Sequence, residues 1–574
     1  MNDVLRVGGK GRVALAISAL AVLAGVVIAA DREAPIERPV VRAAAQVATQ
    51  GLTAQELIVR HQDLHNWLMT ELPEGARERP VTVQLTDAEI TDLATIDLTA
   101  PGPLRVGTVK EVTPGADVNN LRPKLLTQRS KRLSTGVLEQ TDDGGFVWAT
   151  AVTSPGAVGL RVHFTNFSIP EDADMYIFSL EGEAFGPYQR RGPQDTGEFW
   201  SHSIMSDTAI LLLRHFGPAG ADDLARVSFT ISDVGHIAHG LGSSGGEGGA
   251  AAFCSYNDSC VENTNCVGGQ PGFIADVENA AAKMRWIAGC CIYLCSGGLI
   301  ADTAGSQTPY FLTANHCLNK NNVAANLEAF FQYQVNCGAG CPEPYFDPHN
   351  GVARTMGSSV VATNRSGDFT LLQLDQAPPA GSVFLGWNNS PIASSNGAAL
   401  YRISHPAGAP QAYSSHNVDA NSPTCTGWPR GERIYSTDDV GATEGGSSGS
   451  PVVNASGEIV GQLSGCCGFN CGDVCDTGSN WTVDGAFAHY YSSVAPFLDN
   501  GGGCVPSAEN CTNGTDDDCD GDVDCNDADC SGDPACAGGG CVNPGGLPQG
   551  ASCTSDSQCC NNKCKGPPGN MTCR

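Results

Sequence analysis

The segment Gly446-Ser447-Ser448-Gly449-Ser450-Pro451 is the most informative stretch of this 574-residue chain. A serine hydroxyl is a poor nucleophile at neutral pH unless an imidazole takes its proton and a carboxylate orients that imidazole. Glycines on both sides of Ser448 allow the backbone to turn sharply and to direct two amides at one point. The segment therefore predicts Ser448 as a nucleophile and the N–H groups of Gly446 and Ser448 as an oxyanion hole.

Two further segments precede this one in the order that a His, Asp and Ser triad requires. Residues 313–317 read TANHC and residues 367–372 read GDFTLL. We predict that His316 is the general base and that Asp368 orients it. Asp375 is the nearest competitor, and Asp368 is preferred because it directly precedes an apolar strand. Four other histidines are expected to be structural or on the surface: His349, His405, His416 and His489.

These residues resemble the lysyl endopeptidase branch of the trypsin-like serine proteases. The resemblance covers roughly residues 250–500. Beyond the three triad motifs, it includes the short segments 295–300, 310–314, 405–406, 441–444 and 461–463. It implies an all-β fold of two antiparallel barrels with the active site between them. It also implies a disulfide between Cys295 and Cys317. The activity implied is that of a serine endopeptidase, which acts on proteins or peptides and requires no cofactor for catalysis.

The chain departs from this family in two places. Most trypsin relatives have an Asp directly before the nucleophile, where it pairs with a freshly cut N-terminal ammonium, whereas this chain has Ser447. Lysine-specific members have an Asp on the pocket wall, and the matching residue here is Thr482. The pocket-base position is Ala442, and Asp484 is out of register. We therefore expect Ala442, Thr482 and Asp484 to lie at a pocket that prefers neutral side chains.

The chain is strongly acidic, with 61 acidic and 32 basic residues and a formal charge of −29. This charge argues against nucleic acid and anionic membranes as partners. Hydrophobic residues make up 41% of the sequence, which is enough for packed cores. We expect a monomer that meets protein or peptide substrates and does not bind membranes after processing.

Residues 1–30 have the pattern of a signal peptide. Three basic residues, Arg6, Lys10 and Arg12, precede an apolar stretch at 13–30 that ends in two alanines. Because this stretch is about long enough to span a bilayer, an uncleaved signal anchor is the alternative. Cleavage predicts a secreted, extracellular protein.

All 26 cysteines lie at or after Cys254. Fourteen fall within 254–475, six within 504–536 and six within 541–573, so each block is even in number. This density predicts disulfides formed in an oxidising compartment. A thiolate zinc site is the alternative, but the adjacent pairs 290–291 and 466–467 lack the usual spacing of zinc ligands.

Residues 31–248 are predicted to be a propeptide, because the cysteines begin only where the protease-like region 249–499 begins. The propeptide has helical patches before residue 100 and a predicted β-sandwich from about residue 127 to residue 237. A binding domain that stays attached is the alternative. The Gly-rich stretch 240–249 predicts a flexible linker accessible to proteases, and it contains no Lys or Arg.

Residues 504–536 form an acidic block with ten acidic and no basic residues. Alternating carboxylates around Gly521 fit a calcium-binding loop, and a solvated acidic linker is the alternative. The predicted ligands are Asp516, Asp518, Asp520, Asp522, Asp524 and Asp527. Residues 541–574 resemble an inhibitor cystine knot. That resemblance implies three disulfides, Cys541–Cys560, Cys553–Cys564 and Cys559–Cys573.

These features predict a secreted serine endopeptidase that is made as a precursor. The alternative is a secreted adhesive or carbohydrate-binding protein with an inactive protease-like domain. Decay of an enzyme normally removes triad members, and all three predicted members are present here.

Overall fold

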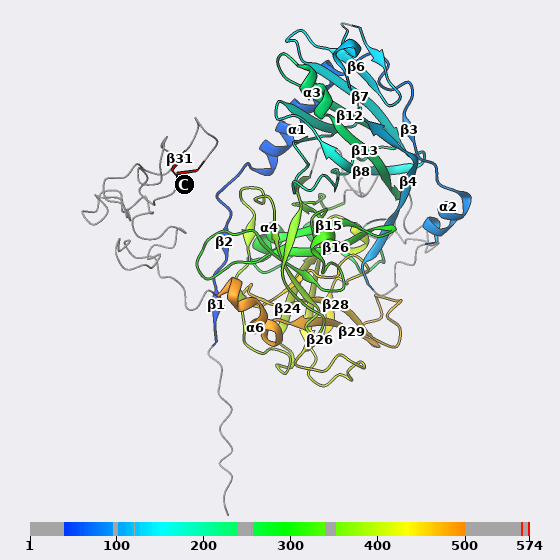
Figure 1. Ribbon diagram of the computed structural model, residues 1–574. Coiled ribbons are helices and arrows are strands. Elements are labelled where there is room, and N and C mark those ends of the chain that lie inside the picture. Colours follow the sequence, from blue (N-terminus) through cyan, green and yellow to red (C-terminus); the bar gives the residue numbers. More distant parts are fainter. Residues whose placement is uncertain are drawn as a thin grey trace, which may run out of the picture. The chain divides into compact units, whose positions relative to one another are not determined.

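The structure is a computed structural model that describes residues 40–95, 102–119, 121–127, 129–238, 254, 257–338 and 352–499 (Figure 1). It also gives the backbone of two short paired strands, β30 (Cys564–Lys565) and β31 (Thr572–Cys573). Strands dominate both the N-terminal region (residues 41–238) and the barrel region (residues 257–499). The predicted all-β class is thereby confirmed.

The N-terminal region contains two packed sheets and a long helix. The helix α1 (Ala54–Glu71) begins with a capping box in which Thr53 Oγ1 accepts from Glu56 N and Glu56 accepts from Thr53 N. The first sheet has the order β10-β9-β12-β7-β6-β5, with β3 beside β7. Its strands are β3 (Val81–Thr82), β5 (Lys131–Arg132), β6 (Val137–Gln140), β7 (Phe146–Thr153), β9 (Ala173–Phe178), β10 (Ala184–Tyr188) and β12 (Thr208–His215).

The second sheet of this region begins earlier in the chain than the predicted sandwich did. Its order is β11-β8-β13-β4, and β4 (Leu104–Val118) precedes the expected start near residue 127. The other strands are β8 (Ala157–Ser168), β11 (Phe199–Trp200) and β13 (Ser228–Ala238). Alternation of the long β4 is broken by exposed polar residues and a Pro, which is why its strand pattern is weak in the sequence.

The first barrel of the barrel region closes through one bent strand. β19 (Ala353–Met356) continues through Gly357, at φ +85, directly into β20 (Ser358–Asn364). The ring therefore runs β16-β17-β21-β20/β19-β18-β15 and returns to β16. Its remaining strands are β15 (Ala281–Ala288), β16 (Cys291–Leu299), β17 (Tyr310–Ala314), β18 (Glu328–Phe331) and β21 (Phe369–Leu374).

The second barrel is a closed ring of six strands in the order β28-β27-β24-β25-β26-β29. These strands are β24 (Ala399–Ser404), β25 (Ala412–Val418), β26 (Arg433–Val440), β27 (Pro451–Asn454), β28 (Ile459–Gly468) and β29 (Asn480–Ala486). The helix α6 (Phe487–Leu498) follows β29, and its buried Phe487 and Val494 belong to the core that the first barrel also forms. The two barrels match the predicted architecture.

The N-terminal region and the barrel region share a sheet. β4 pairs with β16 through Leu104↔Leu294 and Thr108↔Cys291, so one eleven-stranded sheet runs from one region into the other. Two short strands near the start of the described chain also pair with the barrel region. β1 (Arg42–Ala43) pairs with β23 (Trp387–Asn388), and β2 (Gln46–Val47) pairs with β22 (Val383–Phe384).

A buried cluster of charges joins the same two regions. Glu328 of β18 accepts from Ser203 N at 2.9 Å and from Arg354 Nη1 at 3.4 Å, and it lies 3.8 Å from Arg161. Arg354 also binds Glu183 at 2.9 Å. Burial alone would raise the pKa of Glu328, but the positive charges of the surrounding arginines hold this pKa well below its ordinary value. Arg161, Glu183 and Ser203 belong to the N-terminal region, so the cluster spans the junction.

Six disulfides lie within the described barrel region: Cys260–Cys475, Cys266–Cys337, Cys290–Cys291, Cys295–Cys317, Cys425–Cys467 and Cys466–Cys471. The adjacent pairs 290–291 and 466–467 are therefore in disulfides and offer no thiolate to zinc. Among the helices of the described ranges, none combines the length and apolar character needed to cross a membrane.

Candidate active site

His316 and Asp368 are brought together by two paired strands. β17 pairs with β21 in a register that sets Ala314 opposite Phe369, so the residues just after β17 and just before β21 lie side by side. His316 Nδ1 is 2.9 Å from Asp368 Oδ2, and His316 N donates to Asp368 Oδ1 at 3.0 Å. The carboxylate thus holds both the ring and the backbone of His316. Cys317 forms a disulfide with Cys295 directly beside it.

The backbone of Asp368 is held in an unusual conformation. Its φ is +50, a region that non-glycine residues adopt rarely and mostly where surrounding contacts impose it. Here the Asp368 carbonyl accepts from Asn315 N at 3.0 Å and from Gln462 Nε2 at 2.9 Å. Tyr490 donates to Gln462 Oε1 and stacks on Phe369 at 4.2 Å. α6 and β28 therefore both hold the backbone of Asp368, whose carboxylate binds His316.

Ser448 lies on a loop that packs against the end of β17. The Ser448 side chain is mostly buried, with 8% of the residue exposed, whereas the His316 side chain is 24% exposed. No hydrogen bond joins Ser448 Oγ to His316 within the described ranges, and His316 Nε2 instead lies 3.7 Å from Cys317 Sγ. Such contacts between nucleophile and base are often long without substrate. The predicted base and the predicted carboxylate are thus joined by hydrogen bonds, whereas the predicted nucleophile makes no hydrogen bond to the base within the described ranges.

Ser296 holds two carbonyls of the loop that contains the predicted nucleophile (residues 444–450, the nucleophile loop). Its N–H donates to the Ser448 carbonyl at 2.8 Å, and its hydroxyl donates to the Gly446 carbonyl at 2.9 Å. Sequence reasoning assigned Ser296 no role beyond its family-like segment, because the role depends on strands that are distant along the chain. Its role becomes visible only from the two hydrogen bonds between Ser296 of β16 and this loop.

The amides of this loop divide into two sets. Those of Ser447, Gly449 and Ser450 donate to carbonyls within the protein. The amides of Gly446 and Ser448, in contrast, donate to no acceptor in the part of the chain that the structure describes. A pair of unbonded N–H groups beside a serine is what an oxyanion hole requires.

The predicted pocket residues lie on or beside the strands of the second barrel, where Thr482 and one oxygen of Asp484 each bind another side chain. The other oxygen, Asp484 Oδ2, is buried and has no hydrogen-bond partner among the described residues. Asp484 is fully buried and forms an ion pair with Arg402. Burial raises the pKa of Asp484, and Arg402 offsets part of this effect. Thr482 Oγ1 donates to Asp438 Oδ1 at 2.7 Å. Ala442 is buried, with 2% of the residue exposed.

Asp438 is a polar residue of this barrel that the sequence did not single out. Its carboxylate lies 2.7 Å from His416 Nδ1, and His416 Nε2 is 2.8 Å from Ser414 Oγ. Burial alone would raise the pKa of Asp438, but His416 and Thr482 hold it below its ordinary value. The cross-strand register His416↔Asp438 creates this contact. An acidic pair at 438–439 was the only signal in the sequence.

Glu444 connects the nucleophile loop to the start of the barrel region. Its carboxylate accepts from Asn257 Nδ2 at 2.7 Å and from Asp258 N at 2.6 Å. Burial raises the pKa of Glu444, the hydrogen bonds from Asp258 N and Asn257 lower it, and the nearby Asp258 carboxylate adds a smaller increase, so that the pKa is about 7. The sequence included Glu444 in a family-like segment but assigned it no task.

The remaining predicted residues lie away from His316 or outside the described ranges. Asp375, the competitor of Asp368, accepts from Gln194 at 3.3 Å and makes no bond to His316. His405 is buried, with its Nδ1 2.9 Å from the Ala409 carbonyl, and His489 lies 3.3 Å from Ser366 Oγ. His349, the linker 240–249, the six predicted calcium ligands and the side chains of the cystine-knot block fall outside the described residues.

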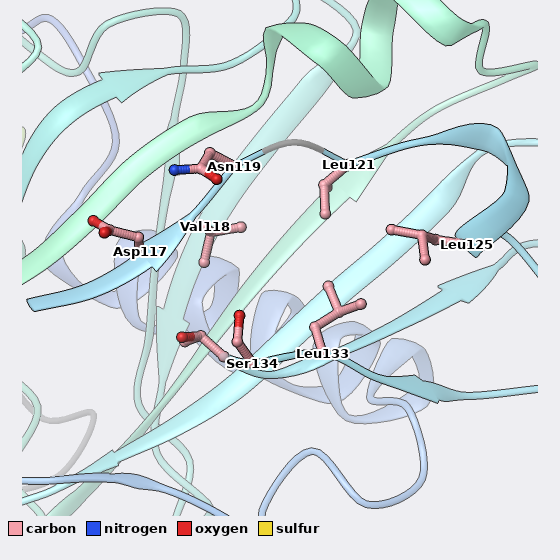
Figure 2. Close-up of a pocket in the computed structure, with 8 residues that line it drawn as sticks. Asp117, Val118, Asn119, Leu121, Leu125, Leu133 and Ser134 are labelled. Atoms are coloured by element: carbon pink, nitrogen blue, oxygen red, sulfur yellow. The ribbon is translucent and has the colours of Figure 1, made fainter.

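Two other features of the molecule are not part of this site. Cys295, His316 and Cys317 cluster within 4.8 Å, but the two sulfurs form a disulfide and offer no thiolate to a metal. A cavity of about 290 Å³ lies in the N-terminal region, at the end of β4 (Figure 2). It is lined by Asp117, Val118, Asn119, Leu121, Leu125, Leu133, Ser134 and Thr135. None of the predicted site residues lies there.

Comparison with known proteins identifies the barrel region. The family model "Lysyl endopeptidase, C-terminal domain" matches residues 255–479. The lysyl endopeptidase of Pseudomonas aeruginosa is 27% identical over 375 residues, which are 64% of this chain and 75% of that protein. The secreted RxLR effector protein 73 of Plasmopara viticola is 24% identical over 333 residues, which are 56% of this chain and 78% of that protein.

Among solved structures, the active form of the Rv3671c protease of M. tuberculosis is similar with a TM-score of 0.26 and 15% identity, over 39% of this chain and 83% of that one. The family model and the P. aeruginosa relative bear directly on the residues described above. The resemblance predicted from the sequence is confirmed: the chain is a lysyl endopeptidase-like protein and a serine endopeptidase.

Proposed function

We propose that this protein is a secreted endopeptidase, made as a precursor, in which Ser448 is the nucleophile, His316 the base and Asp368 the residue that orients the base. The observation that carries this proposal is the pair of hydrogen bonds from His316 to the Asp368 carboxylate. With Nδ1 engaged by the carboxylate, Nε2 is the ring nitrogen that can accept the proton of the serine.

In the proposed reaction, Ser448 Oγ bonds to the carbonyl carbon of the substrate while its proton passes to His316 Nε2. The substrate oxygen becomes an oxyanion and accepts from the N–H groups of Gly446 and Ser448. His316 then gives its proton to the leaving amine as the C–N bond breaks, which leaves an acyl-enzyme. A water molecule repeats these steps and releases the acid.

The pocket is proposed to prefer neutral side chains. A substrate ammonium buried there needs an unpaired carboxylate, because a buried charge without a partner is heavily penalised. Asp484 already pairs with Arg402, and Asp438 is engaged by His416 and Thr482. The residue at the pocket base, Ala442, is uncharged.

The N-terminal region is proposed to be a propeptide that folds against the barrel region. Support comes from the shared β4–β16 pairing and from the buried cluster around Glu328. The relative from P. aeruginosa aligns over more residues than those from 255 to the C-terminus, so the similarity includes part of the N-terminal region. A permanently attached binding domain is the alternative.

Secretion is proposed from the signal-like residues 1–30, and the disulfides of the barrel region are consistent with an extracellular location. The acidic block 504–536 is proposed to bind calcium, which catalysis does not require. We propose a monomer that has protein or peptide substrates and no nucleic acid or membrane partner.

The test is labelling of the purified protein with diisopropyl fluorophosphate, followed by peptide mapping. We expect the phosphoryl group on Ser448 and the loss of casein hydrolysis in proportion to labelling. The variant Ser448→Ala should be neither labelled nor active, since loss of the nucleophile lowers turnover on the order of a millionfold. Absence of labelling in the folded wild-type protein would instead favour the adhesive or carbohydrate-binding alternative.

A further inference from the structure

The Glu444 carboxylate binds a segment that lies almost two hundred residues earlier in the chain. Both of its oxygens are used, one by Asn257 Nδ2 and the other by Asp258 N. Asn257 is buried, with 6% of the residue exposed, and Asp258 is on the surface. Residues 257 and 258 stand near the beginning of the barrel region, just after the predicted linker 240–249.

Asn257 also joins this contact to a third segment. Its Nδ2 donates to the Pro406 carbonyl at 3.2 Å, and the next residue, Ala407, donates its N–H to the Gly445 carbonyl at 2.6 Å. A closed set of hydrogen bonds therefore connects the nucleophile loop, the loop at 405–409 and the start of the barrel region.

Glu444 is also tied through its backbone to the turn that contains the oxyanion amides. Ser447 N donates to the Glu444 carbonyl at 3.0 Å, and Glu444 N donates to Ser447 Oγ at 3.3 Å. The same turn is closely packed at Gly446, because a Cβ on Gly446 would stand 2.9 Å from the His405 carbonyl. The Glu444 side chain therefore anchors a turn that has little room to adjust.

We propose that Glu444 is a positioning residue that holds the N–H groups of Gly446 and Ser448 in the oxyanion-binding orientation by gripping the chain at Asn257 and Asp258. This inference rests on the proposed function of Ser448. Its physical basis is that an ionised carboxylate accepts from both donors, whereas a protonated one offers a hydroxyl in place of one acceptor. Turnover therefore requires Glu444 to be ionised.

The charges around Glu444 help to set the pH at which its carboxyl group ionises. The carboxylate of Asp258, on the facing segment, is a like charge that raises the pKa of Glu444. The pKa of Asp258 is itself raised by burial and by the charge of Asp473. On the third segment, burial lowers the pKa of His405 to about 3, so His405 is neutral near pH 7. Protonation of Glu444 itself, with a pKa of about 7, is then the event that weakens the anchor.

The experiment compares Glu444→Gln with a matched control, Glu458→Gln, in the purified protein used for the labelling test. Glu458 also accepts from two asparagine side chains, Asn388 and Asn454, but it lies on the turn between β27 and β28. We expect E444Q to lower kcat on the order of ten- to a hundredfold, which is less than the loss of an oxyanion donor itself, and to leave KM within about twofold. E458Q should retain wild-type kcat.

The pH dependence distinguishes positioning from general damage. Because glutamine imitates the protonated acid, the ratio of wild-type to E444Q kcat should be largest near about pH 8.5 and approach one near about pH 5.5. The ratio should follow the ionisation of Glu444 at about pH 7. A ratio that is constant with pH, or an unchanged kcat, would overturn the proposal.

Two further measurements separate the possible failures. Asn257→Ala keeps Glu444 but removes one donor, so its kcat should fall in the same direction as that of E444Q, with a retained thermal transition. If Ser448→Ala remained active, the proposed function would fail. If Ser448→Ala were inactive while E444Q and N257A behaved as wild type, only the role of Glu444 would fail.

Discussion

Gly449 lies so close to Thr313 that a Cβ on this glycine would stand 2.2 Å from Thr313 Oγ1. The same Cβ would be 2.6 Å from the Ser296 carbonyl, to which Thr313 Oγ1 donates at 2.9 Å. The residue after the predicted nucleophile thus packs on the strand that leads to the predicted base. The loop around Ser448 can approach β17 this closely because Gly449 has no side chain.

Gly449→Ala is therefore expected to abolish hydrolysis and to destabilise the protein. Gly427→Ala is the matched control, because Gly427 has nearly the same φ, +80 against +81, but a Cβ added to it would meet nothing within 4 Å. G427A should cost only about 1–2 kcal/mol from its left-handed backbone. G449A should cost several kcal/mol more by overpacking. Urea unfolding and casein hydrolysis measure both, and equal effects would contradict the packing argument.

Glu328→Gln is expected to weaken the junction between the two regions, at a cost on the order of 3–5 kcal/mol, because it leaves buried arginines without their partner. The pKa of Glu328 is lowered in the folded protein, so its stabilising contribution is present above its ordinary value of 4.5 and is lost as the pH falls below that value. The free energy of unfolding of the full chain is measured between about pH 7 and pH 3, and its decrease on acidification should be smaller in E328Q. An unchanged pH dependence would contradict the assignment.

Digestion of denatured proteins is expected to give cuts mainly after neutral residues. Asp484→Asn should lower stability, because Arg402 loses its buried partner, and should not change which residues are cut. Sequencing of the product termini gives the preference directly. Cuts almost entirely after Lys, with that preference lost in Asp484→Asn or Asp438→Asn, would show that one of these carboxylates meets the substrate.

Cys317→Ser is expected to reduce stability and activity more than Cys541→Ser does. The Cys295–Cys317 disulfide is directly beside His316, and removal of a native disulfide typically costs about 2–5 kcal/mol. Cys541 lies in a separate block that is expected to close its own disulfides. Secreted yield and specific activity distinguish the two variants, and equal losses of protease activity would count against modular closure.

The residues predicted from the sequence are those whose setting is local. His316 and Asp368 each stand in a short motif at the end of a strand, and Ser448 stands in a short glycine-rich motif on a loop. β17 and β21 bring His316 and Asp368 together in the expected way. The two barrels follow from the same motifs through the family resemblance. Boundaries were less exact, since β4 joins the sandwich before residue 127.

The contacts that escaped prediction depend on pairings between distant strands. Asp438 meets His416 only because of the register between β25 and β26, and Ser296 reaches the nucleophile loop only through the closed first barrel. Glu444 and Asn257 are similarly remote in sequence. Neither periodicity nor motif spacing carries information on such pairs, because each partner alone resembles an ordinary polar residue.

The pairing of β4 with β16 bears on the behaviour of the barrel region once it is alone. One edge of β16 pairs with two different strands. The first half of this edge, including Ile292 and Leu294, pairs with β4, and the second half pairs with β17. Removal of the N-terminal region would leave the first half of that edge with open backbone donors and acceptors flanked by apolar side chains. Such an edge recruits further strands from other chains. Conditions that release residues 41–238 without covering β16 should therefore favour self-association, and the yield of the isolated barrel region should depend on how quickly that edge is covered.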